Sequence, residues 1–515
     1  MKKTIFSILN GLFLLSILYT FYGTLRSSLL DISNINDKVW AFLLILFSII
    51  CILFIPTNTR SFIQKKLKQF FAFFKKNIAI ITKLLFAVGI ILQVIILYYI
   101  HVPIGWDVDG IHASVTELVK NSPDSIASIY LSKNPNNNLF FFLMYFISQI
   151  GNFFHQSLGN SWMFWQLTNT FFMDIGFIFI FLAAKNLFNK KIAYLSFYLA
   201  FIPLALSPWM LVVYTDTIML PVISITLWIY SLTKKKHNNY LVIVLGGLIA
   251  ISYLLKPSSI VFLIAYSMIK LFNLLTDPKK INLKKVLLIT LLFCLPFAGT
   301  MKLFHLFEDH QKLIVLDRNQ AKPWQHFVMM GLTGSGGFSE EDTRATISIP
   351  TKEGKVNYAS EKIAERIKNY GFTGYTKFLM KKHFNNTDRG DFGWGQDGSA
   401  QIYVQSNDPI QIFLRDTYYQ QGEKVKTVRL FMHLMWMITL VGLLFVTRKK
   451  FKNDQDDTLL AILKLTILGA FLYLLLFEGG RSRYLIQYLP FIYMLSANGF
   501  YLQFATIKKN KKALN

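Results

Sequence analysis

Two carboxylates, Asp107 and Asp109, stand one residue apart beside Trp106, directly after a long apolar run. Charge at the edge of a membrane segment is costly, so acids at such positions are candidates for a functional site. A carboxylate within hydrogen-bond reach of a hydroxyl can accept its proton as that hydroxyl attacks a substrate. Neighbouring carboxylates raise each other's proton affinity, which brings one closer to a useful base strength. We predict that one of the two is a general base, and the spacing leaves open which one.

The same Asp-x-Asp spacing has other readings. Two carboxylates can bind a hard divalent cation through their oxygens, and they can also cap a helix or lie in a solvated turn. We therefore leave the metal ligands and any cofactor unassigned, with a divalent cation as an option.

Cations that could face a phosphate come later in the chain. Lys256 lies in a Lys-Pro-Ser-Ser break between two short apolar runs, where it must find an anionic partner or reach water. The alternative is that Lys256 has no role in a site and only extends its ammonium to the lipid headgroups. Arg481 and Arg483 precede the last apolar run, and a guanidinium can make forked contacts to phosphate. We predict that these three residues bind a donor phosphate, although either arginine could instead hold a lipid headgroup or cap a helix.

Four further residues complete the predicted site. Trp106 adjoins the acidic pair, Asn138 ends an Asn-Pro-Asn-Asn-Asn stretch, and Tyr214 and Asp216 lie in a Tyr-Thr-Asp turn. We assign them to orienting substrate, and Asp216 can serve either the acceptor or Lys256. A purely structural turn is the alternative for Asp216.

Composition indicates which elements must position these residues. Of the 515 residues, 53% are hydrophobic and 16% are charged, and long apolar runs recur, as is typical of a polytopic membrane protein. The net charge of +26 comes mainly from short basic clusters between apolar runs, which indicate topology and contact with membrane lipids, not nucleic acid. Cys51 and Cys294 lie inside apolar runs and form no metal pattern.

We predict an all-α polytopic membrane protein with a mixed segment outside the membrane. About twelve runs are long enough to span the bilayer as helices: 4–22, 39–55, 84–101, 163–184, 192–208, 214–232, 240–255, 258–275, 286–304, 430–447, 458–477 and 484–506. With twelve crossings, the basic clusters fall on one side, which is the cytoplasm. Both termini are then cytoplasmic, and the polar features lie on the outer face of what we expect to be a bacterial plasma membrane.

The same count divides the chain into three parts. Residues 1–304 form a transmembrane module with a catalytic outer loop at 102–138 and a juxtamembrane helix at 139–154. Residues 305–427 form an extracytoplasmic domain or lid, and 428–515 carry the last transmembrane helices. We read 139–154 as interfacial because counting it as a crossing would move every later basic cluster to the wrong side.

The order of these motifs resembles the GT-C superfamily of membrane glycosyltransferases, especially bacterial relatives of the dolichyl-phosphate-mannose protein mannosyltransferases (family 39-like). The resemblance covers roughly residues 78–275 and the last spans. It rests on an acidic motif in an outer loop, an Asn-Pro stretch with a juxtamembrane helix, a Tyr-Thr-Asp turn, a Lys-Pro-Ser break and an Arg-Tyr pair: Trp106-Asp107-Val108-Asp109, Asn134-Pro135, Tyr214-Thr215-Asp216, Lys256-Pro257-Ser258 and Arg483-Tyr484.

The resemblance implies a polyprenyl-phosphate sugar donor, inversion at the anomeric carbon and chemistry on the outer face. By analogy, the loop aspartates supply the base, and Lys256 and the terminal arginines face the phosphate. The chain departs from the eukaryotic enzymes in its Asp-Val-Asp spacing, in two added spans and in lacking their soluble repeat domain. These departures leave the sugar and a protein acceptor open.

We therefore expect an inverting hexosyltransferase that moves a sugar from a polyprenyl phosphate to a cell-envelope acceptor, which can be a glycan, a teichoic-acid-type polymer, a lipid or a protein. A transporter or flippase of lipid-linked glycans is the chief alternative, although paired halves with matching broken helices are not evident. An oligosaccharide polymerase or ligase would share the chemistry with a larger donor groove.

Overall fold

Helices make up nearly all of the chain. The structure is a computed structural model that describes residues 2–30, 57–116, 122–236, 238–276, 282–394, 406–449 and 455–513. These residues form α-helices and short 3₁₀ helices joined by turns, with no β-strand among them. The predicted all-α class is confirmed, and the segment expected to be mixed is helical where it is described.

In the described ranges, eight helices are long and apolar enough to cross a membrane: α1 (Lys2–Leu25), α3 (Thr57–Ile100, with its spanning part at Ala72–Ile100), α7 (Trp162–Leu187), α9 (Thr215–Lys236), α11 (Val261–Thr276, counted with the turn from Pro257), α12 (Leu283–His310), α17 (Val425–Val446) and α18 (Gln455–Leu476). Three other predicted spans are also helical: α8 (Lys190–Leu204), α10 (Asn239–Leu255) and α19 (Leu489–Ala513). The predicted span at 39–55 lies outside the described residues.

Short polar residues set where several of these helices begin. Ser161, Asn189, Asn238 and Asn282 each precede an apolar run, and each side chain accepts a hydrogen bond from a backbone N–H of the first turn. Such caps satisfy donors that the helix itself leaves open. The sequence thus marks the boundaries of α7, α8, α10 and α12 locally.

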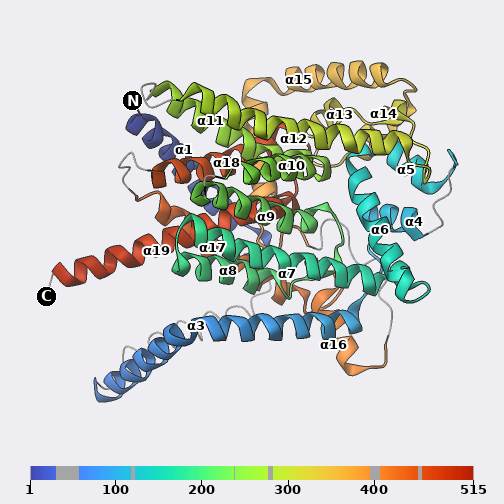
Figure 1. The fold of residues 1–515 in the computed structure, drawn as a ribbon. Helices are drawn as coiled ribbons and strands as arrows, with labels where there is room; N and C mark the ends of the chain where they lie inside the picture. Colours follow the sequence, from blue (N-terminus) through green and yellow to red (C-terminus); the bar gives the residue numbers. More distant parts are fainter. Residues whose placement is uncertain are drawn as a thin grey trace.

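The bundle has two distinct ends. The main helix pairs are α7 with α9, α10 with α12 and α17 with α19. Figure 1 shows the short helices α4 (Trp106–Thr116), α5 (Ile126–Lys133) and α6 (Asn138–Phe154) together at one end, which we call the site end, while both chain termini lie at the opposite end.

The stretch 102–138, which we expected to be a polar loop, contains two helices in its described part. Trp106 has a left-handed φ of 53° and starts α4, while Ser125 caps α5 by accepting from Ser128 N. Asp107 and Asp109 therefore lie in the first turn of α4, where negative charge interacts favourably with the helix dipole. The following helix α6 covers residues 139–154, for which we predict a helix, and its juxtamembrane position stays a prediction.

The segment 305–427 contributes four further helices: α13 (Trp324–Met330), α14 (Glu340–Ser348), α15 (Lys352–Thr387) and α16 (Pro409–Tyr418). Helix α15 bends at Gly371, whose φ is 59°, a conformation that suits glycine. It packs against α13, α14 and α18, whereas α16 packs against α3 and α17. The segment is therefore attached to the apolar helices at two places, through α15 on α18 and through α16 on α3 and α17.

A buried charge cluster holds the end of α15 in place. The fully buried Asp391 carboxylate accepts hydrogen bonds from the Arg389 guanidinium (2.7 and 3.0 Å) and from Arg429 Nε of α17 (2.8 Å). Its backbone oxygen accepts from Trp209 Nε1 (2.9 Å). Because removing one partner of a buried charge is strongly destabilising, we assign this Asp-Arg-Gly-Asp motif to structure.

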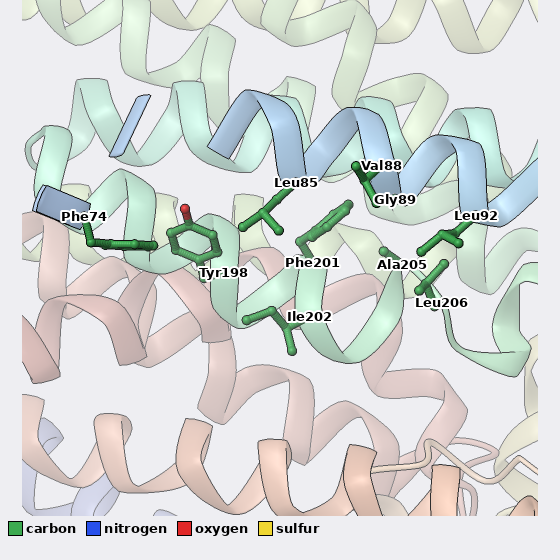
Figure 2. A pocket seen from close by; sticks show the side chains of 10 residues that line it. All are labelled: Phe74, Leu85, Val88, Gly89, Leu92, Tyr198, Phe201, Ile202, Ala205 and Leu206. Atoms are coloured by element: carbon green, nitrogen blue, oxygen red, sulfur yellow. The ribbon is translucent and has the colours of Figure 1, made fainter. Parts of the chain in front are cut away.

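An apolar groove of about 470 Å³ runs between α3 and α8 (Figure 2). Its wall is almost entirely hydrocarbon, and none of the predicted site residues lines it. The groove is formed by Phe74, Leu85, Val88, Gly89, Leu92, Tyr198, Phe201, Ile202, Ala205 and Leu206.

The contact between α10 and α12 yields a stability prediction. A Cβ at Gly246 would lie 2.4 Å from the Phe293 backbone oxygen, whereas at Gly247 the nearest atom, Thr300 Oγ1, would be 3.6 Å away. Both Gly→Ala changes raise helix propensity equally, so only the contact differs. We expect Gly246→Ala to lower the melting temperature in detergent, at a cost of about 1–3 kcal/mol for overpacking, and Gly247→Ala not to. Equal melting temperatures would contradict this close approach of the two helices.

Candidate functional site

Asp107 is held by two tyrosines from separate segments. Tyr130 of α5 donates its hydroxyl hydrogen to Asp107 Oδ1 (2.8 Å), and the Tyr214 hydroxyl lies 3.2 Å from Asp107 Oδ2. Burial, and next the charge of Asp107, raise the pKa of Tyr130 well above its usual value. Tyr130 therefore remains protonated and donates to the carboxylate at neutral pH.

Asn137 completes this carboxylate's support. Its amide nitrogen donates to the Tyr130 hydroxyl (2.9 Å), and its amide oxygen lies 3.2 Å from the Tyr214 hydroxyl. Together these contacts fix the orientation of Asp107 from α4, α5, the turn before α6 and the start of α9. Asp107 itself is half-buried, so its carboxylate is held in one orientation but remains accessible from outside the protein.

Asp109 lies in a different environment. It is exposed, and a step of two residues turns the side chain by about 200° around a helix. Its charge acts on His112, although burial of His112 dominates and lowers the pKa of that imidazole. Of the two predicted bases, the structure brings only Asp107 next to the other site residues.

A buried cation cluster centres on Asp216. Lys256 Nζ donates to Asp216 Oδ1, and Arg483 Nη1 lies 3.8 Å from Asp216 Oδ2. The Asp216 side chain is fully buried, and those of Lys256 and Arg483 are 13% and 4% exposed. Asp216 therefore orients the lysine, which is one of the two roles that the sequence left open.

Aromatic rings join this cluster to Asp107. The Arg483 guanidinium carbon lies 4.2 Å from the centre of the Trp106 ring and 5.9 Å from that of Tyr214. The two rings meet edge to face at 5.2 Å, and a cation over such faces is stabilised by the ring quadrupole. Tyr214 thus contacts both the Asp107 carboxylate and Arg483, and Trp106 packs against Tyr214 and Arg483.

Two predicted site residues have contacts that the sequence did not predict. The chain is extended at Arg481 and enters the 3₁₀ helix Ser482–Tyr488 directly after it, and the Arg481 guanidinium lies 6.0 Å from the Phe338 ring. That Arg481 binds the donor phosphate together with Lys256 and Arg483 therefore stays a prediction. Asn138 donates to Glu308 Oε1 (2.7 Å), and it is the preceding Asn137 that contacts the tyrosines.

The structure adds residues that sequence reasoning missed. Tyr130 and Asn137 stood within the acidic stretch, but only the packing of α5 on α4 brings Tyr130 to Asp107, and Asn137 contacts Tyr130 from the turn after α5. Tyr484 donates to Glu478 Oε1 (2.9 Å), and its ring lies 5.1 Å from Lys256 Nζ. Glu478 thereby adds a second carboxylate beside the cation cluster.

A metal site of conventional composition is not visible in the part of the chain that the structure describes. Those residues contain no group of three or more His, Cys, Asp or Glu side chains placed to hold an ion. We therefore assign no metal ligands.

The fold and the site define a class. Apolar helices surround a buried polar cluster at one end of the bundle, as in an integral membrane protein. A family model described as "Conserved hypothetical integral membrane protein" matches residues 1–501, and the chain belongs to this family. Searches of curated proteins and of solved structures found no match.

The buried ion pair gives the second prediction. Asp216→Asn leaves Lys256 without its carboxylate, and breaking a buried pair costs about 3–5 kcal/mol. We expect this variant to melt at a markedly lower temperature in detergent. Asp109→Asn removes the same charge from an exposed position and is the matched control, expected to melt like the unaltered protein. Similar melting temperatures for all three proteins would contradict the pairing described here.

Proposed function

We propose that the chain is an inverting membrane glycosyltransferase that moves a sugar from a polyprenyl phosphate to a hydroxyl of a cell-envelope acceptor. One observation carries the proposal: at one end of an apolar helix bundle, the half-buried Asp107 carboxylate and the buried Arg483 both lie against Tyr214, and Arg483 shares Asp216 with the buried Lys256. A base and two phosphate-binding cations are the groups that this transfer requires.

In the proposed step, the acceptor hydroxyl attacks the anomeric carbon from the face opposite the phosphate. A new carbon–oxygen bond forms to the acceptor as the bond between the sugar and the phosphate oxygen breaks. The hydroxyl proton passes to Asp107, and the polyprenyl phosphate leaves with the bonding electron pair. Asp107 later releases its proton to water, which returns the enzyme to its starting state. Because the attack comes from the face opposite the phosphate, the configuration at the anomeric carbon is inverted.

The surrounding residues have separate tasks in this mechanism. Lys256 and Arg483 neutralise the charge that develops on the leaving phosphate, which is most effective where water is excluded. Asp216 keeps the lysine in position. Its negative charge also compensates part of the positive charge of Lys256 before the substrate binds. Tyr130 and Tyr214 hold the carboxylate, so little reorganisation is needed when the acceptor approaches.

The proposal includes an orientation in the membrane. The basic clusters between apolar runs favour a cytoplasmic location for their side of the bundle. Both chain termini lie at the end opposite the site (Figure 1). This arrangement supports cytoplasmic termini and a site on the outer face of a bacterial plasma membrane, where a lipid-linked donor and an envelope acceptor can meet.

Sugar transfer by two carboxylate variants tests the proposal. The purified protein in lipid is given a panel of radiolabelled polyprenyl-phosphate sugars, with membrane extract as the source of acceptor. Loss of a general base reduces the rate by roughly 10²–10⁴-fold, so we expect a loss of this size for Asp107→Asn. We expect Asp109→Asn, which changes an exposed acid two residues away, to retain transfer.

Controls separate catalysis from folding. Both variants should melt like the unaltered protein and retain binding of polyprenyl phosphate. Undiminished turnover in Asp107→Asn would refute Asp107 as the base. If the unaltered protein turns over no donor in the panel, the glycosyltransferase proposal fails, and transport of a lipid-linked glycan becomes the function to test.

A further inference from the structure

A chain segment that follows α12 lies along α5, the helix that carries Tyr130 to Asp107. Two serine hydroxyls and one backbone carbonyl of α5 accept hydrogen bonds from its backbone N–H groups: Ser128 Oγ from Val315 (3.0 Å), Ser132 Oγ from Asp317 (2.9 Å) and Lys133 O from Lys322 (3.3 Å). The segment 305–427 is thus fixed to the support of the predicted base, and it brings Lys322 with it.

Lys322 occupies an unusual position for a lysine. It is half-buried, and within the described ranges its ammonium forms no hydrogen bond or ion pair. Burial is the main influence that lowers the pKa of Lys322; the charges of Asp107 and Glu478 act against this, and those of Lys133 and Lys355 act with it. Lys322 therefore lies within electrostatic reach of both the predicted base and two further lysines.

The three lysines come from three different elements. Lys133 is half-buried in the last turn of α5, and Lys355 is buried in α15, where its Nζ donates to the Asn319 backbone oxygen (2.8 Å). Asp317 lies close enough for its charge to act on Lys355. The negative end of the helix dipole favours a cation in the last turn of a helix. This accounts for Lys133, which lies in the last turn of α5, but not for Lys322, which belongs to another segment.

We propose that Lys322 and Lys133, supported by the charge of Lys355, bind a phosphate group of the acceptor beside Asp107. The inference rests on the proposed function and names the acceptor class: an anionic polymer of the polyol-phosphate type. A lysine ammonium binds phosphate as a point charge, and a half-buried ammonium without an ion pair gains such a partner at little cost. The donor phosphate already has Lys256 and Arg483, so we assign this second cation set, which lies along the helix that carries Tyr130 to Asp107, to the acceptor.

A second phosphate of a diphosphate-linked donor would satisfy the same lysines, so the test separates the two sources. Binding of three probes is measured with the protein in lipid nanodiscs: soluble poly(glycerol phosphate), polyprenyl monophosphate and polyprenyl diphosphate. The variant is Lys322→Gln. The matched control is Lys312→Gln, which removes the same charge from an exposed position earlier in the segment.

We expect Lys322→Gln to bind poly(glycerol phosphate) about tenfold more weakly, which corresponds to about 1.4 kcal/mol, and to bind the monophosphate unchanged. Lys312→Gln should bind all three probes like the unaltered protein. The salt dependence of polymer binding should also decrease in Lys322→Gln, because one screened charge contact is lost.

Three results would overturn the inference. If Lys322→Gln weakens binding of the diphosphate alone, the lysines belong to the donor site. If Lys322→Gln binds the polymer like the unaltered protein, Lys322 is not part of a polymer site. If Lys312→Gln loses as much polymer binding as Lys322→Gln, the attraction is non-specific. Because these are binding measurements, they do not depend on transfer. Lysine-dependent polymer binding in a protein that transfers no sugar would refute the proposed function while leaving the anion site intact.

Discussion

The buried pairing of Asp216 with Lys256, and with Arg483 at 3.8 Å, is the constraint on which the site depends. Charges away from water are tolerated only when they are paired, so the helices bearing these residues must meet at one place. Asp216 begins α9, Lys256 ends α10, and Arg483 lies in the 3₁₀ helix before α19. A single electrostatic requirement thereby fixes the register of three helical elements at the site end.

The remaining groups are arranged around that pairing. Arg483 reaches across to the Trp106 ring, and Tyr214 stands two residues before Asp216, so the cation cluster and the Asp107 carboxylate share their neighbours. The segment 305–427 is also part of this arrangement. Its backbone is bonded to α5, and α16 packs on the end of α3 that leads into α4. The segment thereby supports the site through its contacts with α5 and α3.

Much of the fold could be predicted from the sequence because its signals are local. Apolar runs of sufficient length specify spans, and short polar residues such as Asn189 and Asn282 specify where helices begin. Within the site, Asp107, Lys256 and Asp216 were recognisable because charge beside apolar runs is rare and demands a reason. The contrast between Asp107 and Asp109 was not predictable, since it depends on the rotation of α4. Tyr130 and Lys322 were missed for a similar reason. Only the packing of α5 brings Tyr130 to the carboxylate, and only the contact of a distant segment with α5 places Lys322 beside Lys133.

Imaging the protein with its expected donor tests the central claim most directly. A cryo-electron microscopy structure in nanodiscs, with a phosphonate analogue of a polyprenyl-phosphate sugar that cannot be cleaved, would locate the phosphorus and the sugar. The account predicts the phosphonate in contact with Lys256 and Arg483, and the anomeric carbon facing the Asp107 carboxylate. A phosphonate bound away from Lys256 and Arg483, or a sugar with Asp107 on the same side as the leaving group, would contradict it.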